Sequence, residues 1–143
     1  MGSSHVTLVP DEAELYAGSI FVGEAENTLP RFLRDFDNGT LKKRYTDDCA
    51  VDLPQAPLLR KEHFHRRDHT AGTLFATRGC PNSCEFCAIA CMYKNKFRKR
   101  PVEHVARDFA GLKGKVVVFW DDNISADLDY AKKLFAAIEP YKK

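Results

Sequence analysis

The chain has 143 residues, a length typical of one globular domain and sufficient to bury a hydrophobic core without disulfide or zinc cross-links. Hydrophobic residues make up 44% of it and charged residues 29%, a balance that excludes wholesale disorder. The formal net charge of +2 is too small to indicate a nucleic-acid or membrane partner. No apolar run reaches the ~20 residues that a membrane-spanning helix needs. The amino-terminal segment also lacks a signal-peptide pattern, so we expect a cytoplasmic protein.

The first part of the chain is predicted to form a β-α-β-α segment. Short strands are expected at 5–10 and 19–23, with a short helix at 11–17 between them. An amphipathic helix should follow, capped by Asn27 or Thr28 and closed at Gly39. Its apolar residues recur at helical spacing: Leu29, Phe32, Leu33 and Phe36.

Periodicity fades between residues 42 and 72, where Pro54 and Pro57 precede a charged stretch. A connection of this length is unusual inside one domain. We therefore divide the chain into a first unit at 1–45, a linker at 46–72 and a second unit at 73–143.

The second unit repeats the β-α-β-α order. Strands are predicted at 72–77 and 115–120, one helix beginning at Pro101, and a last helix capped by Asp127 and stopped by Pro140. The expected buried residues of the two helices are Val102, Val105, Phe109, Leu112, Ala131, Leu134, Phe135 and Ile138. Alternating strands and helices predict an α/β fold with parallel strands and right-handed crossovers.

Three cysteines, Cys80, Cys84 and Cys87, lie within eight residues. The chain has 5 cysteines, and an odd number in a cytosolic chain favours metal binding or redox chemistry over disulfides. Clustered thiolates select zinc or iron–sulfur centres. A structural zinc commonly uses two Cys-x2-Cys pairs, whereas only Cys84 and Cys87 form one here. Three thiolates would leave one coordination position open, as catalytic sites do.

Polar residues also follow the second strand of this unit, at Asp121, Asp122 and Asn123. Active sites of parallel α/β folds lie at the carboxyl ends of the strands. The cysteine loop and this polar triplet should therefore share one edge of the sheet. The alternative role for the triplet is helix capping and turn formation.

The segment from Cys80 to Cys87 reads Cys-x3-Cys-x-aromatic-Cys, and it resembles the signature of radical S-adenosylmethionine (SAM) enzymes. Residues 76–89, 98–109 and 114–124 resemble consecutive pieces of the subgroup that joins a cobalamin-binding domain to a radical SAM barrel. Residues 5–13 and 22–36 resemble the end of the cobalamin-binding domain, and residues 51–60 resemble the linker.

The resemblance implies a partial Rossmann-like segment followed by the first two βα units of a TIM-like radical SAM barrel. It implies that Cys80, Cys84 and Cys87 hold a [4Fe-4S] cluster and that Phe86 packs beside the cluster and the adenine of SAM. Asp122, with Asp121 and Asn123, matches the strand end that contacts the SAM amino group. The implied reaction is reductive cleavage of SAM to a deoxyadenosyl radical, with an electron donor such as a flavodoxin or ferredoxin.

The resemblance also implies that this chain is an internal fragment. A full barrel takes about 250 residues, and the upstream strands and cobalt-ligating histidine of the cobalamin domain are absent. We therefore give His5 no cobalt role and do not infer cobalamin binding, although cobalamin serves the full-length family. Uncovered sheet edges and helix faces predict self-association or a partner chain. The resemblance places the residues that determine the substrate in barrel strands beyond the two βα units matched here.

The sequence leaves two non-catalytic interpretations open. One is a zinc-binding α/β module that uses the three cysteines and one histidine from the group His63, His65 and His69, although a solvated linker is preferred for these histidines. The other is a remnant without metal. We expect Cys91 to be a buried apolar residue and Cys49 a small buried or linker residue. A basic run, expected to form a solvated loop rather than a phosphate or RNA surface, consists of Lys94, Lys96, Arg98, Lys99 and Arg100.

Overall fold

The structure, a computed structural model, describes residues 1–47, 50–56, 71–112 and 116–141. The chain divides into two units, the first formed by Met1–Asp52 with Cys91–Lys94 and the second by Leu53–Ala90 with Asn95–Lys143. Each unit contains a two-stranded parallel sheet, so the predicted α/β class is confirmed at that level. The predictions for Cys49, His63, His65 and His69 fall outside the described residues.

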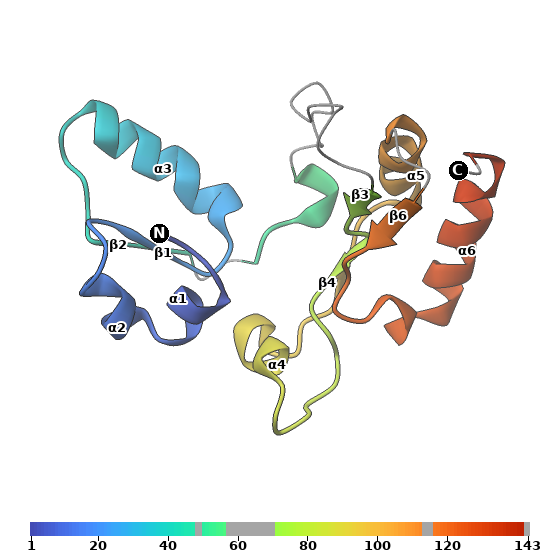
Figure 1. Ribbon diagram of the computed structural model, residues 1–143, viewed down its shortest axis with the longest axis horizontal. Helices are drawn as coiled ribbons and strands as arrows, with labels where there is room; N and C mark the ends of the chain where they lie inside the picture. Colours follow the sequence, from blue (N-terminus) through green and yellow to red (C-terminus); the bar gives the residue numbers. More distant parts are fainter. Residues whose placement is uncertain (48–49, 57–70, 113–115, 142–143) are drawn as a thin grey trace. The chain divides into compact units, whose positions relative to one another are not determined.

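The first unit is built around two short parallel strands, visible in Figure 1 beside three helices. Its elements are α1 (Ser4–Leu8), α2 (Pro10–Glu14), β1 (Ile20–Val22), α3 (Ala25–Asp37) and β2 (Arg44–Thr46). Gly2 forms a parallel bridge to Phe21, so the chain start extends the sheet on the other side of β1. The predicted helix near 11–17, the strand near 19–23 and the amphipathic helix are confirmed.

The predicted strand at 5–10 is wrong, because these residues form most of helix α1. The Ser3 side chain accepts a hydrogen bond from the backbone N–H of Val6 at 3.3 Å, as an N-cap does. The helix buries Val6 against Ala13 and Ile20. This capping and burial outweigh the strand preference of a short Val-Thr segment, because β-propensity is weak beside packing.

Helix α3 begins at Ala25, earlier than the predicted cap at Asn27 or Thr28. Thr28 is instead buried inside the helix, and its hydroxyl donates to backbone carbonyls of the preceding turn. The ring of Phe32 packs against the rings of Phe21 and Tyr45, with centroids 5.2 and 5.4 Å away. Strand β2 was not predicted; it lies across the predicted boundary between the first unit and the linker, with only Thr46 inside the linker.

The second unit combines a parallel pair with a short antiparallel pair. Its strands are β3 (Ala71–Leu74), β4 (Thr77–Arg78), β5 (Arg98–Lys99) and β6 (Val116–Phe119). Strand β3 pairs with β6 in parallel, and β4 pairs with β5 in antiparallel orientation. The helices are α5 (Val102–Gly111) and α6 (Leu128–Ile138), with 3-10 turns η1 (Leu53–Gln55), η3 (Ile124–Ala126) and η4 (Glu139–Tyr141). A further helix, α4 (Ala88–Tyr93), follows the cysteine loop (Figure 1).

One face of the β3–β6 pair is covered by α5 and α6. Leu74, Val105 and Leu134 are fully buried at the centre of this core. The opposite face is apolar but exposed, since Val116 and Val118 of β6 and Trp120 directly after it alternate along the chain and are each more than a third exposed. The predicted burial of Phe135 is wrong: its side chain is 47% exposed, although its ring packs against the ring of Phe119 in a T-shaped pair with centroids 5.8 Å apart.

The stretch between the cysteine loop and α5 is more ordered than predicted. Cys91 lies in α4 and is exposed, so its predicted burial is wrong. Lys99 and Arg100 do not belong to a merely solvated loop, because they form ion pairs with Asp127 and Asp108. No helix in the described part of the chain has the length and apolarity that a membrane crossing requires.

We expect Leu134→Ala to lower the free energy of unfolding by about 2–5 kcal/mol, because it opens a cavity in the core of the second unit. Urea denaturation followed by circular dichroism measures the change. Phe135→Ala on the same helix is the matched control and should cost clearly less, since its side chain is already half exposed. Equal losses for the two variants would contradict this placement of the core.

Candidate functional site

The carboxyl ends of β3 and β6 meet at one edge of the second unit's sheet. Leu74 is paired with Phe119, and the backbone N–H of Trp120 donates to the Leu74 carbonyl oxygen at 2.8 Å. The cysteine loop leaves this edge after β3 and β4, and residues 121–123 leave it after β6. The predicted convergence of the two segments is therefore confirmed.

Asp121 joins these two segments directly. Its carboxylate accepts hydrogen bonds from the Ala76 N–H at 3.1 Å, from the Thr77 hydroxyl at 2.6 Å and from the Thr77 N–H. Ala76 and Thr77 are 0% and 2% exposed, so these donors have little access to water. Asp121 therefore satisfies buried polar groups at the junction between β3 and β4.

The next two residues continue the contact along the loop. The Asp122 carboxylate accepts from the Gly79 N–H at 2.8 Å, and the Asn123 side-chain amide donates to the Cys80 sulfur at 3.4 Å. Gly79 has a φ of +84°, a left-handed conformation that a residue with a Cβ adopts only with strain. The chain thus turns at Gly79 and presents Cys80 to Asn123.

The remaining cysteines are held less firmly. All four described cysteines are free thiols, with Cys84 exposed and Cys80 and Cys87 half-buried. The Cys87 N–H donates to the Cys84 carbonyl oxygen at 3.0 Å, which closes a turn between the two. Phe86, inside that turn, is 93% exposed. Among the described residues, no three His, Cys, Asp or Glu side chains gather closely enough to hold a metal ion.

A second group of charged residues, located at β5, on helix α5 and at the start of α6, lies near the start of the cysteine loop. The Arg100 guanidinium donates to the Phe75 carbonyl at 2.9 Å and to the buried Asp108 carboxylate at 2.5 Å. The Lys99 ammonium lies 2.6 Å from the Asp127 carboxylate. This hydrogen bond, with that from the Tyr130 N–H, lowers the pKa of Asp127.

Tyr130 connects helix α6 to the same junction. Its hydroxyl oxygen lies 3.1 Å from the carbonyl oxygen of Ala76 and 2.8 Å from that of Arg100. Burial of the phenol and, to a smaller extent, the nearby charge of Asp121 together raise the pKa of Tyr130 to about 12. The folded state therefore favours the neutral, protonated phenol of Tyr130 over the phenolate. No feature of the sequence distinguished this tyrosine, because its partners are backbone carbonyls.

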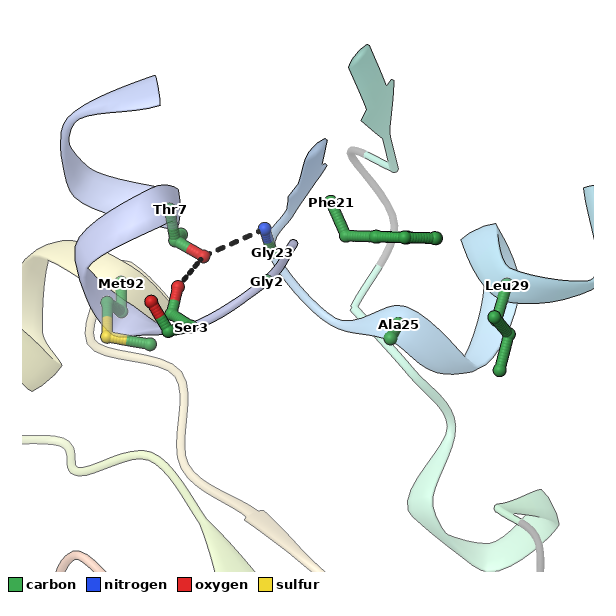
Figure 2. A pocket seen from close by; sticks show the side chains of 8 residues that line it. All are labelled: Gly2, Ser3, Thr7, Phe21, Gly23, Ala25, Leu29 and Met92. Carbon is green, nitrogen blue, oxygen red and sulfur yellow. Dashed lines mark hydrogen bonds between the residues drawn. The ribbon is translucent and has the colours of Figure 1, made fainter. Parts of the chain in front are cut away.

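The first unit has a pocket of its own, with a volume of about 360 Å³ (Figure 2). It is lined by Gly2, Ser3, Thr7, Phe21, Gly23, Ala25, Leu29 and Met92. The Thr7 hydroxyl accepts from the Gly23 N–H at 3.1 Å and donates to the Ser3 carbonyl at 3.0 Å, which ties the two turns at the pocket together. Gly23 has a φ of +85°. In the sequence, this pocket was indicated only by the position of Gly23 at the end of the predicted strand at 19–23, where a glycine can form a turn.

Comparisons with curated proteins point to methyltransferases. The chain is 28% identical to bacteriochlorophyllide d C-8(2)-methyltransferase of Chlorobaculum tepidum over 164 aligned positions, which cover all of this chain and 35% of that protein. It is 28% identical to bacteriochlorophyllide d C-12(1)-methyltransferase of the same organism, over 94% of this chain and 32% of that protein. The chain thus spans about a third of the length of these two relatives.

A third similarity is shorter. Cytidylyl-2-hydroxyethylphosphonate methyltransferase of Streptomyces wedmorensis is 33% identical over 72 aligned positions, or 48% of this chain and 14% of that protein. No protein-family model matches the chain, and no solved structure matches it significantly. All three of these relatives are named as methyltransferases.

We expect Asp121→Asn to lower the free energy of unfolding by about 1–3 kcal/mol, because the amide NH2 would face buried donors that need an acceptor. Hydrogen exchange should show lost protection at the amides of Ala76 and Thr77. Asp129→Asn, an exposed acid on α6, is the control and should leave both amides protected. Unchanged protection in Asp121→Asn would contradict the proposed support of the loop.

We expect the chain to lose stability as the pH rises from about 10 towards 12. The folded state holds Tyr130 neutral up to a pKa of about 12, whereas the unfolded chain releases this proton near 10, so alkaline pH favours unfolding. Phenolate absorbance of the folded chain should contain a component near pH 12 that Tyr130→Phe removes. Burial also raises the pKa of Tyr45, so the variants are compared in chains that carry Tyr45→Phe. In that background Tyr16→Phe should leave the component near pH 12 in place, and its persistence in Tyr130→Phe would refute the assignment.

Proposed function

We propose that this chain is the part of a radical SAM methyltransferase that binds the iron–sulfur cluster and SAM. The observation that carries the proposal is the hydrogen-bonded contact between the Cys80 loop and residues 121–123 at the carboxyl edge of a parallel pair. The similarity to methyltransferases over the whole chain supports it. Two of the named relatives are methyltransferases of bacteriochlorophyllide d and the third is a methyltransferase of cytidylyl-2-hydroxyethylphosphonate, so methyl transfer is the activity that their names share.

The thiols of the loop fit an iron–sulfur cluster in their chemistry. Cys80, Cys84 and Cys87 are free, lie on one loop and are partly accessible, and soft thiolates are the donors that such clusters use. They would hold three irons and leave one position for SAM. When bound, the cluster would supply the electron that cleaves SAM. Because the thiols are not gathered in the structure, cluster binding would order the loop, as metal binding commonly does.

The residues around the loop receive separate roles in this proposal. Phe86 offers an exposed aromatic face for the adenine of SAM. Asp122 has one carboxylate oxygen bonded to Gly79, and its other oxygen is assigned to the SAM ammonium group. Asp121 is assigned to loop support, since buried donors already occupy its carboxylate.

The domain assignment that the resemblance implied is part of this proposal. Residues 1–45 would be the end of a cobalamin-binding Rossmann-like domain, 46–72 a linker, and 73–143 the beginning of a radical SAM barrel. A flavodoxin- or ferredoxin-type protein would deliver the electron. The exposed apolar face of β6 would then belong to the barrel interior.

Anaerobic reconstitution with iron and sulfide tests the proposal. We expect a brown species with about four irons per chain, lost in Cys84→Ala because a ligand is removed. Cys91→Ala is the matched control and should keep the full iron content. Stoichiometric zinc with no visible chromophore would contradict the proposal and favour the zinc-binding module.

The cluster-loaded chain should then convert SAM to deoxyadenosine when a strong reductant is added. Chromatography of the products measures this step, and omission of the reductant is the control. A loaded chain that yields no deoxyadenosine would show that cluster binding is present without the cleavage reaction in this chain.

A further inference from the structure

We propose that Asn123 is a positioning residue that holds the sulfur of Cys80 through an N–H···S hydrogen bond and raises the reduction potential of the cluster. This inference rests on the proposed function, because it concerns the cluster that Cys80 would help to hold. It gives Asn123 a role distinct from that of its neighbour Asp122, which faces the loop backbone.

The geometry gives Asn123 one partner on each side of its amide. Its Nδ2 lies 3.4 Å from the Cys80 sulfur, a distance suited to a hydrogen bond to sulfur. Its Oδ1 accepts a hydrogen bond from the Ser125 hydroxyl at 3.1 Å. Since the oxygen of the amide is taken by a donor, the NH2 group is the side that faces the sulfur. Ser125 therefore fixes the orientation in which Asn123 acts as a donor.

Helix capping does not account for this side chain. Asn123 is the N-cap residue of η3, but its side chain makes no capping hydrogen bond to that turn. The next helix, α6, is capped by Asp127, whose carboxylate accepts from the Tyr130 N–H. The amide of Asn123 is thus directed at a thiol rather than at a helix end.

The chemistry gives this contact a measurable consequence. A donor hydrogen bond to a ligating sulfur stabilises the electron-rich, reduced form of a cluster more than the oxidised form, and hydrogen bonds to sulfur are one determinant of cluster potentials. Loss of the donor should therefore make the reduction potential more negative. Loss of Ser125 should act in the same direction but more weakly, because the amide remains and only its orientation is freed.

The test is a redox titration of the reconstituted full chain, followed by electron paramagnetic resonance, together with iron analysis. Asn123→Leu removes the donor at nearly constant size and charge. We expect it to keep the wild-type iron content while its midpoint potential shifts to a more negative value. Ser125→Ala should shift the potential by a smaller amount in the same direction.

Asn82→Leu is the matched control, because Asn82 is an exposed asparagine in the same loop and should leave the potential unchanged. An unchanged potential in a fully loaded Asn123→Leu chain would overturn this inference and leave the proposed function intact. Equal shifts in Asn123→Leu and Asn82→Leu would also overturn it, since the effect would then not depend on the bond to sulfur. A wild-type chain that takes up no cluster would overturn both proposals.

Discussion

The carboxylate of Asp121 is the interaction on which the second unit's site depends. The backbone N–H groups of Ala76 and Thr77 are buried where the chain passes from β3 to β4. A buried donor without a partner costs about 1–3 kcal/mol, and Asp121 removes this cost for both donors and for the Thr77 hydroxyl. Because Asp121 lies two residues after the end of β6, the same bonds fix the position of the cysteine loop relative to the strand ends.

Elements with a strong apolar pattern were predictable from the sequence, and short elements held by distant partners were not. The strand at β6, the helices α3, α5 and α6, and the Asp127 cap all appear where the local sequence places them. Part of the apolar face of two helices is nevertheless exposed, at Leu29, Leu33, Phe36 and Phe135. Strand β5 is only Arg98–Lys99, and it exists because β4 lies opposite. Helix α1 depends on the Ser3 cap and on the burial of Val6. The local sequence pattern shows neither the pairing of β5 with β4 nor the burial that stabilises α1.

The site was predictable in place but not in detail. The carboxyl ends of parallel strands meet at one edge of a sheet, and this rule predicted that residues 121–123 lie next to the cysteine loop. The rule did not distinguish the roles of the three residues toward a cofactor. The structure gives each a different partner, at Thr77, Gly79 and Cys80 in turn. This assignment depends on the register that pairs Leu74 with Phe119. A slip of one residue would turn every side chain to the opposite face, and no sequence pattern fixes such a register for two short strands.

The loop is fixed at one end and open at the other, and this asymmetry bears on how it would bind a cluster. Gly79 and Cys80 are held by Asp122 and Asn123, whereas Cys84 and Phe86 are exposed. Ordering a backbone residue costs about 1–2 kcal/mol, so a loop with one ligand already positioned loses less entropy when metal–thiolate bonds form. Under the proposed function, Cys80 is then the anchoring ligand, and the other two thiols would close onto the cluster as it assembles. Under the same proposal, the sheet edge would position the first ligand, and the exposed turn would close as the cluster assembles.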